Sequence, residues 1–264
     1  MTIFNGQKFA QERQKILRVK VKKLSFTPRL VSILVGTDPA SLLYTKLKQK
    51  AARKVGINFK IKKFPENINF KEIIEEIEEY NNDDSIQGIM IQLPLPASLK
   101  LKTKNILRAI APQKDVDGLT LNSLFVPATV KAIVEIVEFA TKPLAYFGKK
   151  ASVVGASGTV GRGIVKKLKE KGFKVTECDQ KTRDLYAKLH EADLIVSATG
   201  VPNLIKGEII KEGAILIDVG APKGDIDPSA AKRASFATPV PGGVGPVTIV
   251  SLLDNLVNAC LNTK

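Results

Sequence analysis

Short apolar runs alternate with helix-length segments along this chain of 264 residues, and no other feature restricts its possible folds as strongly. Seven segments are predicted to be strands, at residues 30–35, 57–64, 86–93, 151–154, 173–178, 193–198 and 214–219, and the first of them is expected to be buried. The segments within the first half predict helices at 39–55, 70–80 and 99–110. Asp38 and Pro39 are typical of a helix start, and Gly56 is typical of a helix end. Repeated strand–helix–strand order produces parallel sheets, which predicts an α/β protein.

The strand-like runs fall into two blocks, which predicts two α/β lobes. We place the first lobe at residues 1–127 and the second at 128–246. Linking helices are expected at 128–140 and 247–261, and the second should return the chain to the first lobe, so that 247–264 belong to that lobe. We find no apolar run of ~18 residues and no apolar signal core at the start, so we expect a cytoplasmic protein without a transmembrane helix.

The net charge of +15, from 41 basic and 26 acidic residues, could attract nucleic acid or small polyanions. The lysines are scattered and not interleaved with aromatic residues, and tryptophan is absent. We therefore expect a solvated basic surface and no nucleic-acid partner, although a basic nucleic-acid-binding module remains an alternative. Cys178 and Cys260 are the only cysteines and His190 is the only histidine, so neither a disulfide framework nor a metal site is predicted.

A glycine-rich turn begins the second lobe, where residues 151–163 read ASVVGASGTVGRG between a predicted strand and a helical pattern. Gly155 permits a tight turn, while Gly158 and Gly161 allow a ligand or another backbone to approach. The first N–H groups of the helix could bind a pyrophosphate, which predicts a Rossmann-like dinucleotide-binding domain. The predicted cofactor-binding residues are Gly155, Ala156, Ser157, Gly158, Thr159, Val160, Gly161, Asp179, Thr199 and Gly200. The spacing is G-x-x-G-x-x-G rather than G-x-G-x-x-G, so a strand–turn–helix corner without a ligand remains an alternative.

Asp179 lies at the end of the strand that follows the glycine-rich turn. A carboxylate there can accept hydrogen bonds from both hydroxyls of an adenosine ribose and would repel a 2′-phosphate, which favours NAD over NADP. Two alternatives remain: Lys181 and Arg183 could hold a 2′-phosphate, or Asp179 could be a solvent-facing turn residue.

Four polar residues of the first lobe are candidates for catalysis. Tyr44 and Lys48 share one helix face because they are four residues apart, and burial would lower the pKa of the lysine. Gln92 ends a predicted parallel strand, where ligands collect in such sheets. The carboxylate of Asp117 could accept two parallel N–H bonds from a ligand. Ordinary alternatives exist for each: a surface lysine covering an aromatic ring, a side chain capping a strand end, and a loop turn.

Several segments together closely resemble the methylenetetrahydrofolate dehydrogenase/cyclohydrolase family. They are VGTDPASLLYTKLKQKA at 35–51, GIMIQLPLP at 88–96, KDVDGL at 114–119, VVGASGTVGR at 153–162, ADLIVSATG at 192–200, IDVG at 217–220, GDID at 224–227 and TPVPGGVGPVT at 238–248. They follow the family's order over most of the chain. The resemblance implies oxidation of 5,10-methylenetetrahydrofolate with NADP or NAD, followed by hydrolysis of the methenyl product to 10-formyltetrahydrofolate, in a homodimer.

The resemblance also implies roles for individual residues. Lys48 is the key catalytic group, Gln92 orients and tunes it, and Asp117 holds the pterin ring. Tyr44 stacks on or positions the aminobenzoyl part of the folate. The implied substrate-binding residues are Tyr44, Leu93, Pro94, Asp117, Pro241, Gly242, Gly243, Gly245 and Pro246. Catalysis of both reactions would require Lys48 and Gly155 to face a shared crevice.

Two departures from the family pattern bear on the cofactor and the substrate cleft. The usual V-G-R-S has Ala156 in place of its arginine, and the usual H-S-K-T begins here with Asp179, so we expect NAD to be preferred. The segment after Leu121 is shorter than in the family, which puts cleft closure in doubt. Retention of only one activity, and a different two-lobed dehydrogenase of the shikimate type, remain alternatives.

Overall fold

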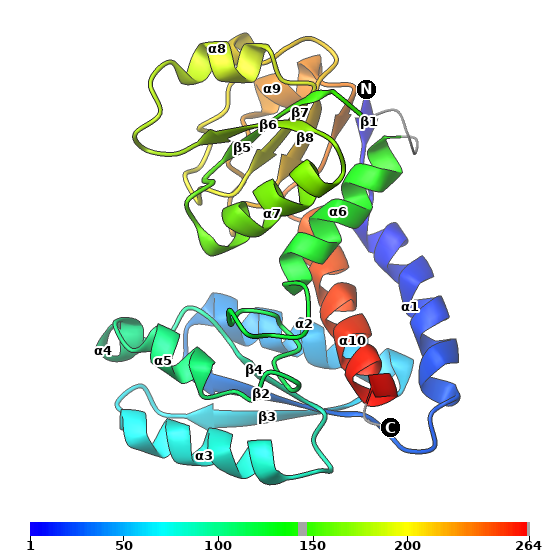
Figure 1. Cartoon of the computed structure of the whole chain (residues 1–264), viewed down its shortest axis with the longest axis vertical. Coiled ribbons are helices and arrows are strands. Elements are labelled where there is room, and N and C mark those ends of the chain that lie inside the picture. Colours follow the sequence, from blue (N-terminus) through cyan, green and yellow to red (C-terminus); the bar gives the residue numbers. More distant parts are fainter. Residues whose placement is uncertain (142–146, 263–264) are drawn as a thin grey trace. The chain divides into compact units, whose positions relative to one another are not determined.

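The computed structural model describes residues 1–141 and 147–262, which form two compact units (Figure 1). One unit consists of Met1–Ala10 and Thr129–Thr248, and the other consists of Gln11–Ala128 and Ile249–Lys264. We call them the six-stranded unit and the three-stranded unit, after their sheets. Both sheets are entirely parallel, which confirms the α/β class predicted from the alternation of apolar runs.

The six-stranded sheet has the strand order β1-β9-β8-β7-β5-β6. Its strands are β1 (Thr2–Ile3), β5 (Lys150–Val154), β6 (Lys174–Cys178), β7 (Leu194–Ser197), β8 (Ile215–Asp218) and β9 (Phe236–Ala237). The order reverses after β5, because β6 lies on one side of it and β7 on the other. In doubly wound sheets such a reversal opens a crevice at the carboxyl ends of the strands, where ligands bind.

Helices cover both faces of this sheet, as a buried parallel sheet requires. One face packs against α6 (Ala128–Ala140) and α7 (Thr159–Glu170) through a core that includes Ile133, Ile164 and Val196. The other face packs against α8 (Leu185–His190), the 3-10 helix η1 (Gly207–Ile209) and α9 (Pro228–Arg233). Figure 1 shows these layers in the part of the chain coloured green to orange.

The three-stranded sheet has β2 (Arg29–Val35) at its centre, between β3 (Asn58–Phe64) and β4 (Gly88–Ile91). One face packs against α3 (Phe70–Asn82), α4 (Ala97–Lys100) and α5 (Thr103–Arg108). Next to β2 and β3 lies α2 (Pro39–Val55), and Leu256 of α10 (Val244–Asn262) fills the space left by the missing side chain of Gly88. The carboxyl end of β2 leads through residues 36–38 into α2, which carries Tyr44 and Lys48, and that of β4 leads directly into Gln92.

The second linking helix returns to the three-stranded unit, as predicted. Most of α10 belongs to that unit, together with most of α1 (Gly6–Lys22). An ion pair of 3.0 Å joins Lys20 of α1 to Asp254 of α10. Asn255 donates from Nδ2 to the carbonyl oxygens of Val116 and Val126, each at 2.9 Å. The C-terminal helix therefore holds both ends of the segment that contains Asp117.

Some elements differ from the predictions made from sequence. The expected helix at 99–110 is two short helices, α4 and α5, separated at Leu101, whose side chain is 98% exposed. No helix was predicted at 6–22, where α1 lies, because its many lysines, arginines and glutamines obscure the apolar stripe. The last helix begins at Val244, three residues before its predicted start, since a proline is tolerated in a first turn.

One helix of the described residues, α10, is long and apolar enough by length and mean composition to cross a membrane, over Val244–Leu261. This does not contradict the expectation that no apolar run reaches about 18 residues, because Ser251, Asp254 and Asn255 interrupt the apolar sequence. However, 72% of that window is buried inside the structure, as in the core helix of a globular protein.

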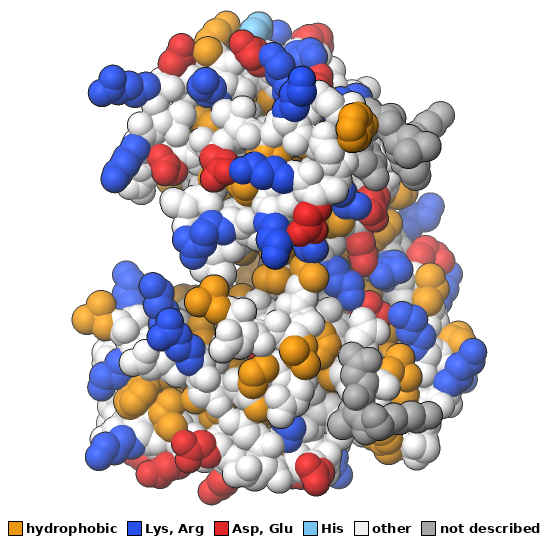
Figure 2. All heavy atoms as spheres, viewed as in Figure 1, with side chains coloured by type: hydrophobic (Ala, Val, Ile, Leu, Met, Phe, Trp, Pro, Cys, Tyr) orange, Lys and Arg blue, Asp and Glu red, His pale blue; other side chains and the backbone are white. Residues whose placement is uncertain are grey.

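Figure 2 shows lysine and arginine side chains spread over the visible face and interspersed with acidic ones, rather than gathered in one patch.

Candidate functional site

Lys48 and Gln92 meet at the carboxyl end of β4. Gln92 follows β4 directly and is buried. Its Nε2 donates to the carbonyl oxygen of Leu93 at 2.7 Å, which leaves Oε1 facing α2. Lys48 of α2 donates from Nζ to this Oε1 at 2.9 Å, and the hydroxyl of Thr45 lies 3.5 Å from the same oxygen. A neutral acceptor thus fixes the position of the amine.

Burial changes the pKa of Lys48 and of Asp117 in opposite directions. Burial lowers the pKa of Lys48, and the charge of Asp117 opposes this in part. Burial raises the pKa of Asp117, while Lys48 lowers it and the nearby Asp115 raises it further. Desolvation favours the uncharged form of each group, so both pKa values move toward neutral pH. This combination suits a lysine that must release its proton to act as a base.

A network of buried charges holds the loop that carries Asp117. Nζ of Lys114 donates at 2.8 to 2.9 Å to three carbonyl oxygens at the end of α3, those of Tyr80, Asn81 and Asp83. The carboxylate of Asp115 accepts the N–H groups of Gly118, Leu119 and Thr120 and the hydroxyl of Thr120. Neither Lys114 nor Asp115 was singled out from the sequence. Their burial, 8% and 1% exposed, marks them as residues that shape the site.

The other candidate residues of the three-stranded unit lie near these groups along the chain. Tyr44 is half-buried and one helical turn before Lys48 on α2. Leu93 and Pro94 continue from Gln92, the first half-buried and the second exposed. The short segment after Leu121 leaves apolar side chains in solvent: Leu121 is 94% exposed and Leu124 is 69% exposed. These exposed leucines border the loop that carries Asp117.

The glycine-rich turn has the geometry of a phosphate-binding corner. Gly155 has φ +87°, and an added Cβ would lie 2.5 Å from the carbonyl oxygen of Ala198. At Gly161 an added Cβ would lie 2.1 Å from the carbonyl oxygen of Gly155, so α7 approaches the turn as closely as backbone allows. Gly158 precedes α7 and provides no side-chain cap. The N–H groups of Thr159 and Val160 therefore point out of an uncapped helix start, which suits an anionic ligand.

Asp179 immediately follows β6, which pairs with β5 beside the glycine-rich turn. One of its oxygens, Oδ1, accepts the N–H of Lys181 at 2.8 Å, and its own N–H donates to the hydroxyl of Thr182. The residue is thus part of a turn, while Oδ2 has no partner among the described residues. Lys181 and Arg183 form no ion pair within the described parts of the chain. The Oδ2 atom of Asp179 is suited to a ribose hydroxyl, and the cationic side chains of Lys181 and Arg183 are suited to a 2′-phosphate.

Thr199 and Gly200 follow β7, the strand next to β5, and a buried carboxylate holds them. Oδ2 of Asp225 accepts the N–H of Thr199 at 2.7 Å, its hydroxyl at 2.9 Å and the N–H of Gly200 at 3.3 Å. The hydroxyl of Ser197 donates to the same oxygen at 2.8 Å. We did not single out Asp225 as a site residue from sequence, although it lies in the GDID segment.

The glycines around the start of α10, from Gly242 to Gly245, are present for different structural reasons. Gly242, with φ +101°, and Gly245 have no atom within 4 Å of an added Cβ, so both border open space. Gly243 is packed instead, since an added Cβ would lie 2.5 Å from the carbonyl oxygen of Pro239. Pro241 and Pro246 flank this run. Two of the three glycines therefore leave room for a ligand, and the third is required by the packing of the loop.

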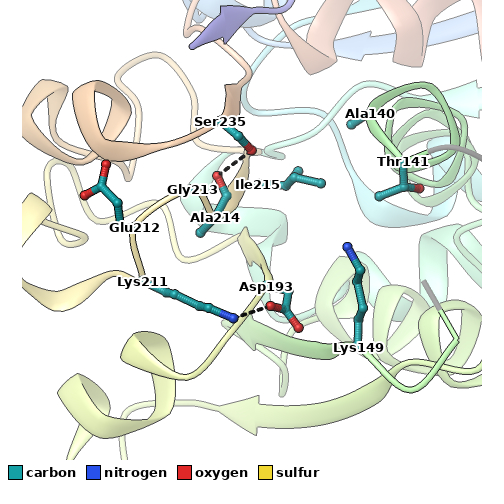
Figure 3. A pocket seen from close by; sticks show the side chains of 10 residues that line it. All are labelled: Ala140, Thr141, Lys149, Asp193, Lys211, Glu212, Gly213, Ala214, Ile215 and Ser235. Carbon is teal, nitrogen blue, oxygen red and sulfur yellow. Dashed lines mark hydrogen bonds and ion pairs between the residues drawn. The ribbon is translucent and has the colours of Figure 1, made fainter. Parts of the chain in front are cut away.

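A hollow of about 440 Å³ lies at the opposite end of the six-stranded sheet (Figure 3). It is lined by Lys149, Asp193 and Lys211 together with the backbone before β8, and Lys211 pairs with Asp193 at 2.5 Å. These residues precede the strands, whereas ligands of doubly wound sheets bind at the carboxyl ends. We therefore do not assign the cofactor to this hollow. Among the described residues, no group of histidine, cysteine or acidic side chains could hold a metal ion.

The chain is similar to known proteins over its whole length. The profile described as "Tetrahydrofolate dehydrogenase/cyclohydrolase, catalytic domain" matches residues 4–117, and the profile described as "Tetrahydrofolate dehydrogenase/cyclohydrolase, NAD(P)-binding domain" matches residues 127–264. The "Bifunctional protein FolD" of Bacillus licheniformis is 39% identical over 99% of this chain and 98% of its own.

Solved structures give the same result. The bifunctional enzyme FolD of Campylobacter jejuni has a TM-score of 0.93 and 36% identity, covering 100% of both chains. The methylenetetrahydrofolate dehydrogenase-cyclohydrolase of Trypanosoma brucei, solved with NADP and an inhibitor, has a TM-score of 0.92 and 30% identity over 99% and 98% of the two chains. A shikimate dehydrogenase shares only the fold, at 13% identity and a TM-score of 0.57, which argues against the shikimate-type alternative. The chain therefore belongs to the tetrahydrofolate dehydrogenase/cyclohydrolase family.

Proposed function

We propose that this protein is a bifunctional enzyme of one-carbon metabolism. It oxidises 5,10-methylenetetrahydrofolate to the methenyl form with NAD(P)⁺, and it hydrolyses the methenyl form to 10-formyltetrahydrofolate. The observation that carries this proposal is the contact of 2.9 Å between Nζ of Lys48 and Oε1 of Gln92, beside Asp117. We expect Tyr44, Leu93, Pro94 and Asp117 of the three-stranded unit to contact the substrate. Residues Pro241 to Pro246 are expected to contribute further substrate contacts.

In the hydrolysis, uncharged Lys48 takes a proton from the water that attacks the methenyl carbon. The lowered pKa of Lys48 increases the fraction of the enzyme that holds this uncharged amine. Breaking the bond between that carbon and N5 then leaves the formyl group on N10, and N5 receives a proton. Gln92 keeps the amine in place throughout, because its own amide is anchored to the backbone at Leu93.

In the oxidation, bound NAD(P)⁺ would accept the hydride that leaves the methylene carbon. The uncapped start of α7 and the close-packed turn at Gly155 suit its pyrophosphate. A charged Lys48 would repel the cationic methenyl product, so the uncharged amine also favours this step. Asp117 orients the pterin through the N–H groups of its aminopyrimidine.

We further propose that NAD is the preferred cofactor. Ala156 offers no positive charge at the position where the family pattern has arginine, and Asp179 keeps Oδ2 available for a ribose hydroxyl. Turnover with NAD⁺ and NADP⁺ at equal concentrations tests this preference, and a higher kcat/KM with NADP⁺ would disprove it. We also propose a cytoplasmic homodimer in which residues 1–127 and 247–264 form the substrate and catalytic lobe and residues 128–246 form the dinucleotide-binding lobe.

The test of the main proposal is a spectroscopic assay of both reactions, repeated on Lys48→Met. Wild-type protein should reduce NAD(P)⁺ in the presence of methylenetetrahydrofolate and should also consume methenyltetrahydrofolate. The variant should lose hydrolysis and normal oxidation while retaining cofactor binding. Hydrolysis without oxidation in the wild type would show a single retained activity, and unchanged hydrolysis in Lys48→Met would remove Lys48 from the mechanism.

A further inference from the structure

Asp225 is a fully buried carboxylate whose hydrogen bonds all point one way. Its Oδ2 accepts four hydrogen bonds, two from Thr199 and one each from Ser197 and Gly200. Its Oδ1 is buried without a hydrogen-bond partner among the described residues. A single oxygen with four donors is a charge-assisted arrangement, whereas the orphaned oxygen is unfavourable. The free-energy cost of burying Oδ1 without a partner is offset by the four hydrogen bonds that Oδ2 accepts.

Oδ2 holds the loop that follows β7. The N–H groups of Thr199 and Gly200 turn inward to the carboxylate, and the hydroxyl of Thr199 also accepts the N–H of Val201 at 3.1 Å. These hydrogen bonds restrain the backbone of the loop, in which Gly200 adopts φ +71° and borders open space. The loop therefore presents a fixed surface at the carboxyl end of the central strands, where the cofactor is expected.

The loop that follows β7 is also in close contact with the glycine-rich turn. The carbonyl oxygen of Ala198, the residue between Ser197 and Thr199, is the atom that an added Cβ on Gly155 would meet at 2.5 Å. A shift of the loop toward the turn would displace Gly155, and a shift away would leave the turn unsupported. Asp225 is thus connected through two backbone contacts to the turn that faces the pyrophosphate.

The carboxylate of Asp218 fixes the backbone that carries Asp225. Oδ1 of Asp218, at the end of β8, accepts the N–H of Asp225 at 3.1 Å and that of Gly220 at 2.8 Å, and its Oδ2 accepts the N–H of Ile226 at 2.9 Å. Burial raises the pKa of Asp218, and the three N–H groups oppose this. The backbone that carries Asp225 is therefore tied to the end of a central strand, so its side chain acts as a rigid support.

We propose that Asp225 is a positioning residue that sets the affinity of the enzyme for its dinucleotide by holding residues 198–200 against Gly155. This inference rests on the proposed function. Replacement by asparagine keeps the shape but removes the charge, and either orientation of the amide is worse. If the amide oxygen faces the four donors, it accepts their hydrogen bonds without a negative charge, so the bonds are weaker. If the NH₂ group faces them, it cannot accept a hydrogen bond and the four donors lose their acceptor.

The experiment compares Asp225→Asn with Asp227→Asn. Asp227 lies two residues later, and among the described residues its carboxylate accepts hydrogen bonds only from Ser229 at the start of α9. The same chemical change there therefore leaves residues 198–200 unaffected. We expect the dissociation constant for NADH, measured by fluorescence, to rise about tenfold or more in Asp225→Asn and to stay unchanged in Asp227→Asn. Hydrolysis of methenyltetrahydrofolate should remain within about twofold of the wild type in both variants.

A purely structural role gives a different pattern. It lowers the melting temperature and reduces oxidation and hydrolysis equally, with an unchanged dissociation constant for NADH, and that result would overturn the proposal. Faster amide hydrogen exchange at Thr199 and Gly200 in Asp225→Asn, but not in Asp227→Asn, would support it. If Asp225→Asn does not fold, Ser197→Ala removes one of the four donors, and a dissociation constant equal to that of the wild type would count against the role of this network.

Failure of the proposed function is recognised in the wild type alone. A wild-type protein that binds neither NADH nor NADPH contradicts the proposed function and the role of Asp225 together. A wild-type protein that binds NADH and hydrolyses methenyltetrahydrofolate, combined with an unaffected Asp225→Asn variant, contradicts only the role of Asp225.

Discussion

Replacing Gln92 with leucine should move the pH dependence of methenyltetrahydrofolate hydrolysis to lower pH. The side chain accepts a hydrogen bond of 2.9 Å from Nζ of Lys48, and this bond is stronger when the amine is charged. Removing the acceptor therefore favours the uncharged amine. Burial already lowers the pKa of Lys48, and the variant should lower it further. Because the uncharged amine is the proposed base, the rising limb of the profile should begin at a lower pH.

The size of this shift follows from the hydrogen bond. A bond to a charged group contributes about 1.5–3 kcal/mol, and its neutral counterpart about half of that, so the difference is about 1 kcal/mol. Since one pKa unit corresponds to about 1.4 kcal/mol, we expect a shift of about half a unit to one unit. Lys48 keeps some contact with solvent, which places the expected shift toward the lower value.

The control is Gln87→Leu, at the other end of β4. Gln87 directly precedes the strand, and its amide accepts from the N–H of Arg29 at 2.9 Å and donates to the carbonyl oxygen of Asp84. This variant makes the same substitution beside the same strand, but far along it from Lys48, so its profile should match that of the wild type. A profile for Gln92→Leu that is unmoved, or moved to higher pH, would refute the role assigned to the contact between Gln92 and Lys48.

Three further outcomes follow from the described contacts. Gly155→Ala should lower the free energy of unfolding, measured in urea, by about 2–4 kcal/mol. The reason is that φ +87° is strained for alanine and that the methyl group would lie 2.5 Å from the carbonyl oxygen of Ala198. An unchanged urea midpoint would contradict this prediction. Lys114→Met should lower the free energy of unfolding by about 2–4 kcal/mol and raise KM for the folate. The substitution leaves three carbonyl oxygens at the end of α3 without their donor, next to the loop that carries Asp117. An unchanged KM would show that the position of this loop does not depend on Lys114. Asp38→Ala should lower the urea midpoint, because the carboxylate caps α2 through the N–H of Ser41 at 2.7 Å and its pKa lies below 3.8. The contribution of a carboxylate with a lowered pKa is complete above pH 3.8 and disappears as pH falls through the folded value, so wild type and Asp38→Ala should converge in acid.

Local sequence signals predicted the elements that position the site, but not the hydrogen bonds that tune it. Asp38, Pro39 and Gly56 correctly marked α2, because caps act within a few residues of the helix end. By contrast, α1 was missed, because much of its stability comes from packing in the folded chain and its sequence is rich in charge.

The remaining site residues depend on contacts between distant segments. The orientation of Gln92 is set by Leu93, but its partner Lys48 is 44 residues away, and only the resemblance to a family pointed to the pair. Asp225 lies 25 to 28 residues from the groups that it binds, so no periodicity in the sequence could indicate its role. Gly243 looked equivalent to Gly242 and Gly245 in the sequence, and only the packing separates it from them.

The three-stranded unit is built from two distant parts of the chain, residues 11–128 and the last part of α10. On the ribosome, the sheet and the loop with Asp117 therefore emerge long before Leu256 can cover Gly88 and before Asn255 can bridge Val116 to Val126. The exposed core of the nascent three-stranded unit must avoid aggregation while residues 129–248 of the six-stranded unit are synthesised. Hydrolytic activity should accordingly arise only at chain termination, and a transcript cut short by a few dozen codons should yield an inactive, protease-sensitive product.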